Sequence, residues 1–186
     1  MKYFYIHGLN ATGRTSANLL SKTLEKDVTV LSWNQTKTFK ENFNSMLHTL
    51  EREKDDIILI GSSMGGYYAN ALANKLQVPC ALFNPVMNPR ETLKELKSKD
   101  KEHLLDNLSD DVINSYIREK DTVIPRVVVI GLQDTITDPY ESIKYWRDKC
   151  YLKVLVNAGH EIKNFADFKN DILELENLFF IDFSEI

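Results

Sequence analysis

A serine stands between two glycines in the stretch Gly61-Ser62-Ser63-Met64-Gly65, where an apolar run is followed by a segment rich in Ala and Leu. A sharp turn between a strand and a helix can expose a side chain at its apex only if the neighbouring residues are small. Gly61 and Gly65 meet that demand. The G-x-S-x-G spacing therefore predicts a nucleophile elbow with Ser63 at the apex. The alternative is an ordinary strand-to-helix turn in which the serine only caps the helix.

A serine hydroxyl is a useful nucleophile only if a base removes its proton and a third group orients that base. Among the four histidines, His160 is the only one that follows Ser63 at the end of an apolar run. Asp134 follows the preceding apolar run, whereas Asp138 is explained as the N-cap of a helix that begins at Pro139. Ser63, Asp134 and His160 occur in the order that a nucleophile-elbow triad requires, and we predict them as the catalytic residues.

Backbone N–H groups would have to stabilise the oxyanion that forms during attack. The first donor is expected from Met64, the residue after the nucleophile, and the second from Leu9, in the loop after an early strand. Gly8 lets the backbone of that loop approach a substrate closely. Three asparagines near the same edge are candidate pocket residues, although Asn-Pro pairs are equally common in turns: Asn10, Asn84 and Asn88.

Six short apolar runs bounded by turn residues are the elements that must position these groups: 2–6, 28–33, 57–61, 79–83, 126–131 and 151–156. Continuous apolar character predicts buried, mainly parallel strands. Segments with helical spacing lie between them, and 38–54 has a capping box at Thr38 and Glu41. A last amphipathic helix is expected to bury Phe165, Phe168, Ile172 and Leu175. The sequence thus predicts the α/β class, a three-layer α/β/α sandwich with about six strands.

The interval 85–122 separates two predicted strands by more than one crossover helix needs. It is charged and has helical character. Two interpretations stay open: a set of surface helices, or a helical cap over the carboxyl edge of the sheet. With this insertion included, we expect residues 1–186 to form a single domain.

Composition excludes several classes of function. The 186 residues are 43% hydrophobic and carry a net charge of −4, with no cluster of basic and aromatic residues, so nucleic acid is not an expected partner. No apolar segment approaches the roughly 20 residues of a membrane span, and none resembles a signal peptide. Cys80 and Cys150 lack metal-ligand spacing, and we expect them to be reduced thiols of a cytoplasmic protein. The oligomeric state is not indicated.

Five stretches together resemble the α/β-hydrolase superfamily: HGLN at 7–10, GSSMGG at 61–66, NPVMNP at 84–89, GLQD at 131–134 and AGH at 158–160. More narrowly, they are similar to the small bacterial YqiA-type esterases over residues 3–165. The resemblance implies hydrolysis of a small-molecule carboxylic ester with no cofactor and no metal. A thioester or amide substrate stays open, because the same triad serves all of these. The insertion at 85–122 departs most from the family pattern.

Two other functions compete with a serine esterase. Gly8–Thr15 comes within one residue of the phosphate-binding loop G-x-x-x-x-G-K-[ST], which indicates a nucleotide-binding phosphotransferase or ATPase. Arg14 stands where that motif has lysine, and no later strand ends in an aspartate suited to magnesium. The third possibility is a hydrolase fold that only binds a ligand. A binding role would not require three triad residues in this order.

Overall fold

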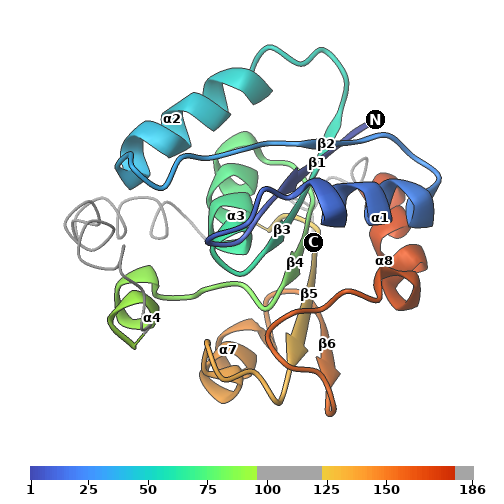
Figure 1. Ribbon diagram of the computed structural model, residues 1–186. Coiled ribbons are helices and arrows are strands. Elements are labelled where there is room, and N and C mark those ends of the chain that lie inside the picture. Colours follow the sequence, from blue (N-terminus) through green and yellow to red (C-terminus); the bar gives the residue numbers. More distant parts are fainter. Residues whose placement is uncertain (96–122, 179–186) are drawn as a thin grey trace.

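The six expected strands form one sheet in the computed structural model, which describes residues 1–95 and 123–178 (Figure 1). The order is β2-β1-β3-β4-β5-β6, and every strand pairing is parallel. The prediction of a mainly parallel sheet is confirmed. The strand bounds are β1 (Lys2–Ile6), β2 (Val28–Val30), β3 (Ile57–Ser62), β4 (Cys80–Phe83), β5 (Arg126–Gly131) and β6 (Tyr151–Leu155).

Helices cover both faces of the sheet, so the three-layer α/β/α prediction is confirmed. In Figure 1, α1 and α8 lie on one side of the strands, and α2, α3 and α7 lie on the other. The helical bounds are α1 (Arg14–Leu24), α2 (Phe39–Leu50), α3 (Met64–Leu76), α4 (Pro89–Glu95), α7 (Pro139–Trp146), the 3₁₀ helix η1 (Phe165–Phe168) and α8 (Lys169–Leu178).

Side chains alternate along each central strand between two buried layers, as expected for a sheet covered on both faces. In β3, Ile58 and Ile60 face the layer of α1 and α8. Ile57 and Leu59, on the same strand, face the layer of α2, α3 and α7. This double burial explains why the strands appear in the sequence as continuous apolar runs.

Local capping signals fix where several helices begin. Thr38 and Glu41 form the expected capping box at the start of α2. Asp138 accepts hydrogen bonds from the N–H groups of Tyr140 and Glu141 and so caps α7. The last amphipathic segment buries the four expected apolar residues. It begins as a 3₁₀ turn, and the α-helix starts only at Lys169.

The interval 85–122 is described only in part. Its first section contains α4, a helix of 7 residues that begins at Pro89. The remaining section of the expected cap, 96–122, lies outside the described residues. Whether the interval acts as a cap therefore stays a prediction.

The topology determines where a site can form. The chain passes from β1 outward to β2 and then crosses to β3 on the opposite side of β1. Such a switch point leaves a crevice at the carboxyl ends of the two strands, because the connections leave in opposite directions. Gly8 follows β1 and Ser63 follows β3. All strands being parallel, the residues after β5 and β6 lie at this same edge of the sheet.

Candidate active site

Ser63 occupies a strained turn between β3 and α3. Its backbone dihedrals are φ 55° and ψ −124°, a combination that a side-chain-bearing residue rarely adopts. A Cβ added at Gly61 would lie 2.8 Å from Ala69 Cβ, and one added at Gly65 would collide with the carbonyl oxygens of Ile6 and His7. Only glycine therefore fits on either side of this turn, and the half-buried Ser63 side chain is left at the edge of the sheet.

Ser63, His160 and Asp134 form a continuous chain of hydrogen bonds. Ser63 Oγ lies 2.8 Å from His160 Nε2, and His160 Nδ1 lies 2.7 Å from Asp134 Oδ2. The three residues are separated by up to 97 positions in the sequence. The parallel sheet brings them together because each follows a different strand: β3, β5 and β6.

The surroundings of Asp134 keep its carboxylate ionised. Burial alone would raise the pKa of this carboxyl group. Hydrogen bonds from His160, from the Thr137 hydroxyl and from the N–H groups of Ile136 and Thr137 outweigh burial, so the pKa lies below its usual value. The Thr137 hydroxyl donates to Oδ2 at 2.6 Å, the oxygen that also faces His160.

The charge on Asp134 determines the arrangement of protons on His160. An ionised carboxylate can only accept hydrogen bonds, so Nδ1 of the neutral imidazole must carry the proton. Nε2 then presents a lone pair to the Ser63 hydroxyl at 2.8 Å. This is the protonation pattern that a general base for serine needs.

The expected oxyanion loop lies against Ser63. A Cβ added at Gly8 would be 3.2 Å from Ser63 Cβ and 3.7 Å from Ser63 Oγ. Among the described residues, neither the Met64 N–H nor the Leu9 N–H donates a hydrogen bond. Both are thus free to serve as oxyanion donors, and that role is a prediction.

His7 and Trp33 hold the oxyanion loop in place. His7 Nδ1 lies 2.8 Å from the Gly8 carbonyl oxygen, and the Trp33 indole donates to the His7 carbonyl at 2.9 Å. The two rings stack with centroids 5.6 Å apart. The sequence analysis did not assign Trp33 a role. The contact joins residues 26 positions apart, and only the pairing of β1 with β2 brings them together.

Asn84 is not a pocket residue. Its side chain is fully buried, and its backbone has φ 41°, which asparagine tolerates better than most residues. The amide nitrogen donates to the carbonyl oxygens of Gly159 and His160 at 2.9 and 2.8 Å, and the amide oxygen accepts from the Gly131 N–H at 2.7 Å. Asn84 therefore ties the loop of His160 to the end of β5, and it has no group left for a ligand.

The other two asparagines are exposed. Asn10 lies in the turn after β1 with φ 57°. Asn88 accepts a hydrogen bond from the Glu91 N–H at the start of α4 and lines a cavity of about 450 Å³, whose wall also includes Ile136 and Thr137. This cavity adjoins the site on the side of Asp134, because Thr137 bonds to that carboxylate.

A second cavity adjoins the site on the side of Gly8. It has a volume of about 560 Å³ and is lined by His7, Ala11, Thr12, Arg14, Ser32, Trp33, Asn34 and Gln35. The stretch Gly8–Thr15 thus begins against Ser63 and ends in the first turn of α1, which starts at Arg14.

Within the described part of the chain, no group of three or more His, Cys, Asp or Glu side chains could hold a metal ion.

The sheet order, the elbow and the position of the site at the carboxyl edge define a protein with the α/β-hydrolase fold. A family model matches residues 2–177, and the chain belongs to that family, the uncharacterised protein family UPF0227.

Three solved structures illustrate the likeness in fold. Est1E from Butyrivibrio proteoclasticus has a TM-score of 0.68 at 17% identity, over 94% of this chain and 88% of that one. A protein from Agrobacterium vitis S4 that is named a putative hydrolase has a TM-score of 0.64 at 15% identity, over 94% of this chain and 88% of that one. An esterase from Pyrobaculum calidifontis has a TM-score of 0.58 at 14% identity, over 95% of this chain and 76% of that one.

Among the described residues, every helix is too short or too polar to span a membrane.

Proposed function

We propose that this protein is a serine hydrolase that cleaves small carboxylic esters through an acyl-enzyme intermediate. The observation that carries the proposal is the unbroken chain of hydrogen bonds from Ser63 Oγ through His160 to the ionised Asp134. The strained backbone of Ser63 has no evident structural benefit, since a turn in a relaxed backbone conformation could also join β3 to α3. The esterase among the similar structures supports the same reaction class.

In the proposed reaction, Ser63 Oγ attacks the ester carbonyl while His160 Nε2 takes the hydroxyl proton. Asp134 holds Nδ1–H and stabilises the imidazolium that forms. The N–H groups of Met64 and Leu9 stabilise the negative oxygen of the tetrahedral intermediate. His160 then gives its proton to the leaving alcohol. In the second half of the reaction, water attacks the acyl-enzyme with His160 again as the base.

The two cavities beside the site leave room for both halves of an ester. The cavity on the side of Gly8 is about 560 Å³ and that on the side of Asp134 about 450 Å³. Both volumes fall in the range typical of pockets for small molecules. A substrate carbonyl at Ser63 would therefore extend its acyl and alcohol parts in opposite directions.

The decisive experiment measures hydrolysis of p-nitrophenyl esters of increasing chain length by the wild type and three variants. Ser63→Ala should abolish turnover. Asp134→Asn should lower kcat by up to about 10⁴-fold, because the imidazole loses the acceptor that sets its tautomer. Asp148→Asn is the matched control: it alters an exposed carboxylate that pairs with Arg147 and lines neither of the two cavities beside Ser63. Full activity in Asp134→Asn would refute the assignment of the acid.

A fluorophosphonate probe separates the remaining alternatives. Labelling of Ser63 supports the serine hydrolase. Failure of the folded protein to react would favour a hydrolase fold that only binds its ligand. ATP hydrolysis that is lost in Arg14→Ala would instead favour a phosphate-binding role for Gly8–Thr15.

A further inference from the structure

Arg126 is a buried charge that the proposed reaction does not use. It is the first residue of β5, at the edge of the sheet opposite to Ser63, and only 8% of it is exposed. Arginine is seldom buried this far without an acidic partner, because removing a charge from water costs several kcal/mol. Its surroundings therefore indicate what compensates the charge.

The hydrogen-bond partners of Arg126 are neutral. Nε donates to Asn70 Oδ1 at 3.1 Å, and Nη2 donates to Asn74 Oδ1. The guanidinium also lies 6.0 Å from the centre of the Trp146 ring. Within the described residues, no Asp or Glu forms an ion pair with it. The amides and the indole orient the positive charge, but they do not neutralise it.

Two thiols beside Arg126 do not supply a negative charge either. Cys80 pairs with Arg126 across β4 and β5, and Cys150 directly precedes β6 on the other side. Burial raises the pKa of the Cys80 thiol to about 11, although Arg126 lowers it in part. Burial likewise raises the pKa of Cys150 to about 12. Both sulfurs are protonated at neutral pH, so the row of three side chains carries a net positive charge.

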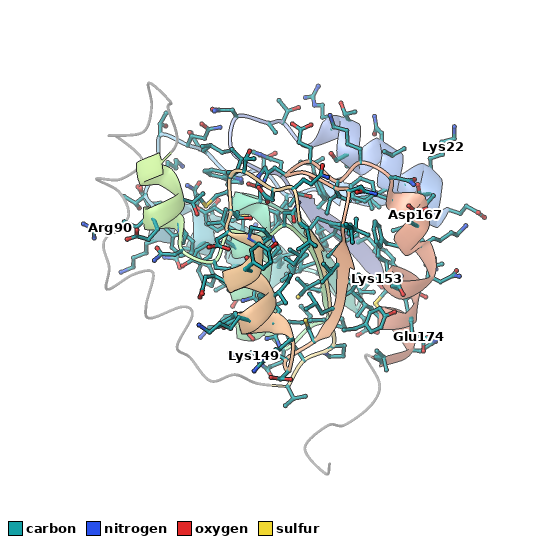
Figure 2. All side chains as sticks on the ribbon, turned by 90° about the horizontal axis from the view of Figure 1, so that it is seen from below. Lys22, Arg90, Lys149, Lys153, Asp167 and Glu174 are labelled. Atoms are coloured by element: carbon teal, nitrogen blue, oxygen red, sulfur yellow. The ribbon has the colours of Figure 1, made fainter. Side chains whose placement is uncertain are left out.

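A cavity of about 360 Å³ is lined by Arg126 and, among other residues, by Asn70, Asn74, Tyr145, Trp146 and Lys149. Figure 2 shows Lys149 just beyond the end of α7. Its Nζ lies 3.6 Å from the centre of the Tyr145 ring. Asp148 is the one acidic residue among the described residues of the lining, and its largely exposed carboxylate pairs with Arg147 at 3.1 Å. The formal charge of the described lining residues is positive, because Arg126 and Lys149 stand against the single carboxylate of Asp148.

The polar side-chain atoms of this cavity that have no hydrogen-bond partner among the described residues are mainly donors. Nη1 of Arg126 has no hydrogen-bond partner among the described residues, and Ser62 Oγ is the only fully buried side-chain polar atom there without one. Nη1 is therefore not fully buried, and the side chain that carries it lines the cavity. Because Asn70 and Asn74 accept from Arg126 through Oδ1, their NH₂ groups are left as donors, and neither donates to a described residue.

We propose that this cavity is a second ligand site that binds a phosphate group, either as the free anion or as a small phosphomonoester. An ionised phosphate oxygen can accept hydrogen bonds but cannot donate them. It therefore matches a lining of guanidinium and amide donors. The volume exceeds what the anion alone needs and leaves space for an organic group beside Tyr145 and Trp146. The site is separate from Ser63, because it lies at the amino end of β5 and the triad lies at the carboxyl end.

The first test measures the melting temperature of the protein in sodium phosphate and in sodium chloride at equal ionic strength. Phosphate should raise the wild-type melting temperature in a saturable way, because a ligand that binds only the folded state stabilises it. Arg126→Met should remove this response, and phosphate should then bind about 30-fold or more weakly. Arg147→Gln is the matched control, since it removes an exposed arginine that does not line the cavity and should leave the response intact.

A second variant keeps the test valid if Arg126→Met folds poorly. Asn74→Asp places a carboxylate of the same size against Nη2, so it should neutralise Arg126 internally and also abolish the phosphate response. Phosphate-specific stabilisation that survives in either variant, provided that the variant is folded, would overturn the proposal. Absence of any phosphate response in the wild type would overturn it too.

Phenyl phosphate and phenol distinguish the two sources of the phosphate group. Tighter binding of phenyl phosphate than of inorganic phosphate indicates a phosphomonoester, and equal binding indicates the free anion. Binding of phenol but of neither phosphate would overturn the proposal. None of these measurements depends on esterase activity, so they remain informative if Ser63 proves not to be a nucleophile.

Discussion

Asn84 provides the sharpest test of how the fold supports the candidate active site. Its side chain makes three hydrogen bonds: two to the carbonyl oxygens of Gly159 and His160 and one from the Gly131 N–H. Asn84→Ala leaves these groups without their partner. An unpaired buried polar group costs about 1 to 3 kcal/mol. Water can reach the partly exposed carbonyls of Gly159 and His160 but not the buried Gly131 N–H, so we expect a loss of about 3 to 4 kcal/mol.

This loss should be visible in thermal unfolding and in turnover. For a domain of this size, each kcal/mol corresponds to roughly 2 to 4 °C, so the melting temperature should fall by roughly 10 °C. The loop that carries His160 would no longer be fixed to β5. Displacement of a catalytic group by about 1 Å can lower turnover by about 10²-fold, and the effect should appear in kcat and leave KM nearly unchanged.

Two further substitutions at position 84 test the backbone conformation and the charge of the side chain separately. Asn84→Gly removes the same hydrogen bonds but tolerates φ 41°, so it should be more stable than Asn84→Ala by about 1 kcal/mol. Asn84→Asp keeps the shape but turns a carboxylate oxygen toward two carbonyl oxygens, which it repels when ionised. It should therefore be the most damaging at pH 8 and improve as the pH falls. An Asn84→Asp protein with wild-type melting temperature and kcat would refute this account of the loop.

Two other predictions concern the elbow and the acid. Gly65→Ala should lower the free energy of unfolding by about 3 kcal/mol or prevent folding, because its Cβ would collide with the backbone carbonyls at the end of β1. Soluble yield and denaturant unfolding measure this effect. Wild-type stability in this variant would contradict the prediction. Asp134 has a lowered pKa, so its ionised form stabilises the fold fully above the unfolded value of about 3.8 and this stabilisation is lost as the pH falls through the lower folded value. The difference in melting temperature between the wild type and Asp134→Asn should accordingly shrink below about pH 4; a difference that stays constant there would show that the carboxylate is not stabilised by its neighbours.

The sequence alone is sufficient to distinguish the roles of Asp134 and Asp138. Asp138 precedes Pro139 and stands three positions before Glu141, which is the pattern of an N-cap, and the structure confirms that role. Asp134 lies just past the end of β5, where the acid of a triad must sit, and its Oδ2 lies 2.7 Å from His160 Nδ1. The bond from Thr137 to Asp134 was missed. A threonine three positions after an aspartate is a local signal that could have indicated it.

Asn84 shows why other contacts could not be predicted. Its two carbonyl partners lie 75 and 76 positions further along the chain. They become neighbours only because β4 pairs with β5 and the loop after β6 returns over that edge. Nothing in the motif NPVMNP distinguishes an asparagine that lines a pocket from one that clamps a loop, since turns and pockets favour the same residue type.

The sequence by itself determined the elements and the candidate chemistry of this protein. Apolar runs, glycines and capping residues act over a few positions, so the strands, the elbow at Ser63 and the helix starts are encoded locally. The tertiary structure alone decided the order of the strands, the clamp at Asn84 and the burial of Arg126 among neutral partners. These features depend on contacts between residues that are distant in the chain, and the free energy of such contacts is fixed only when the sheet has assembled.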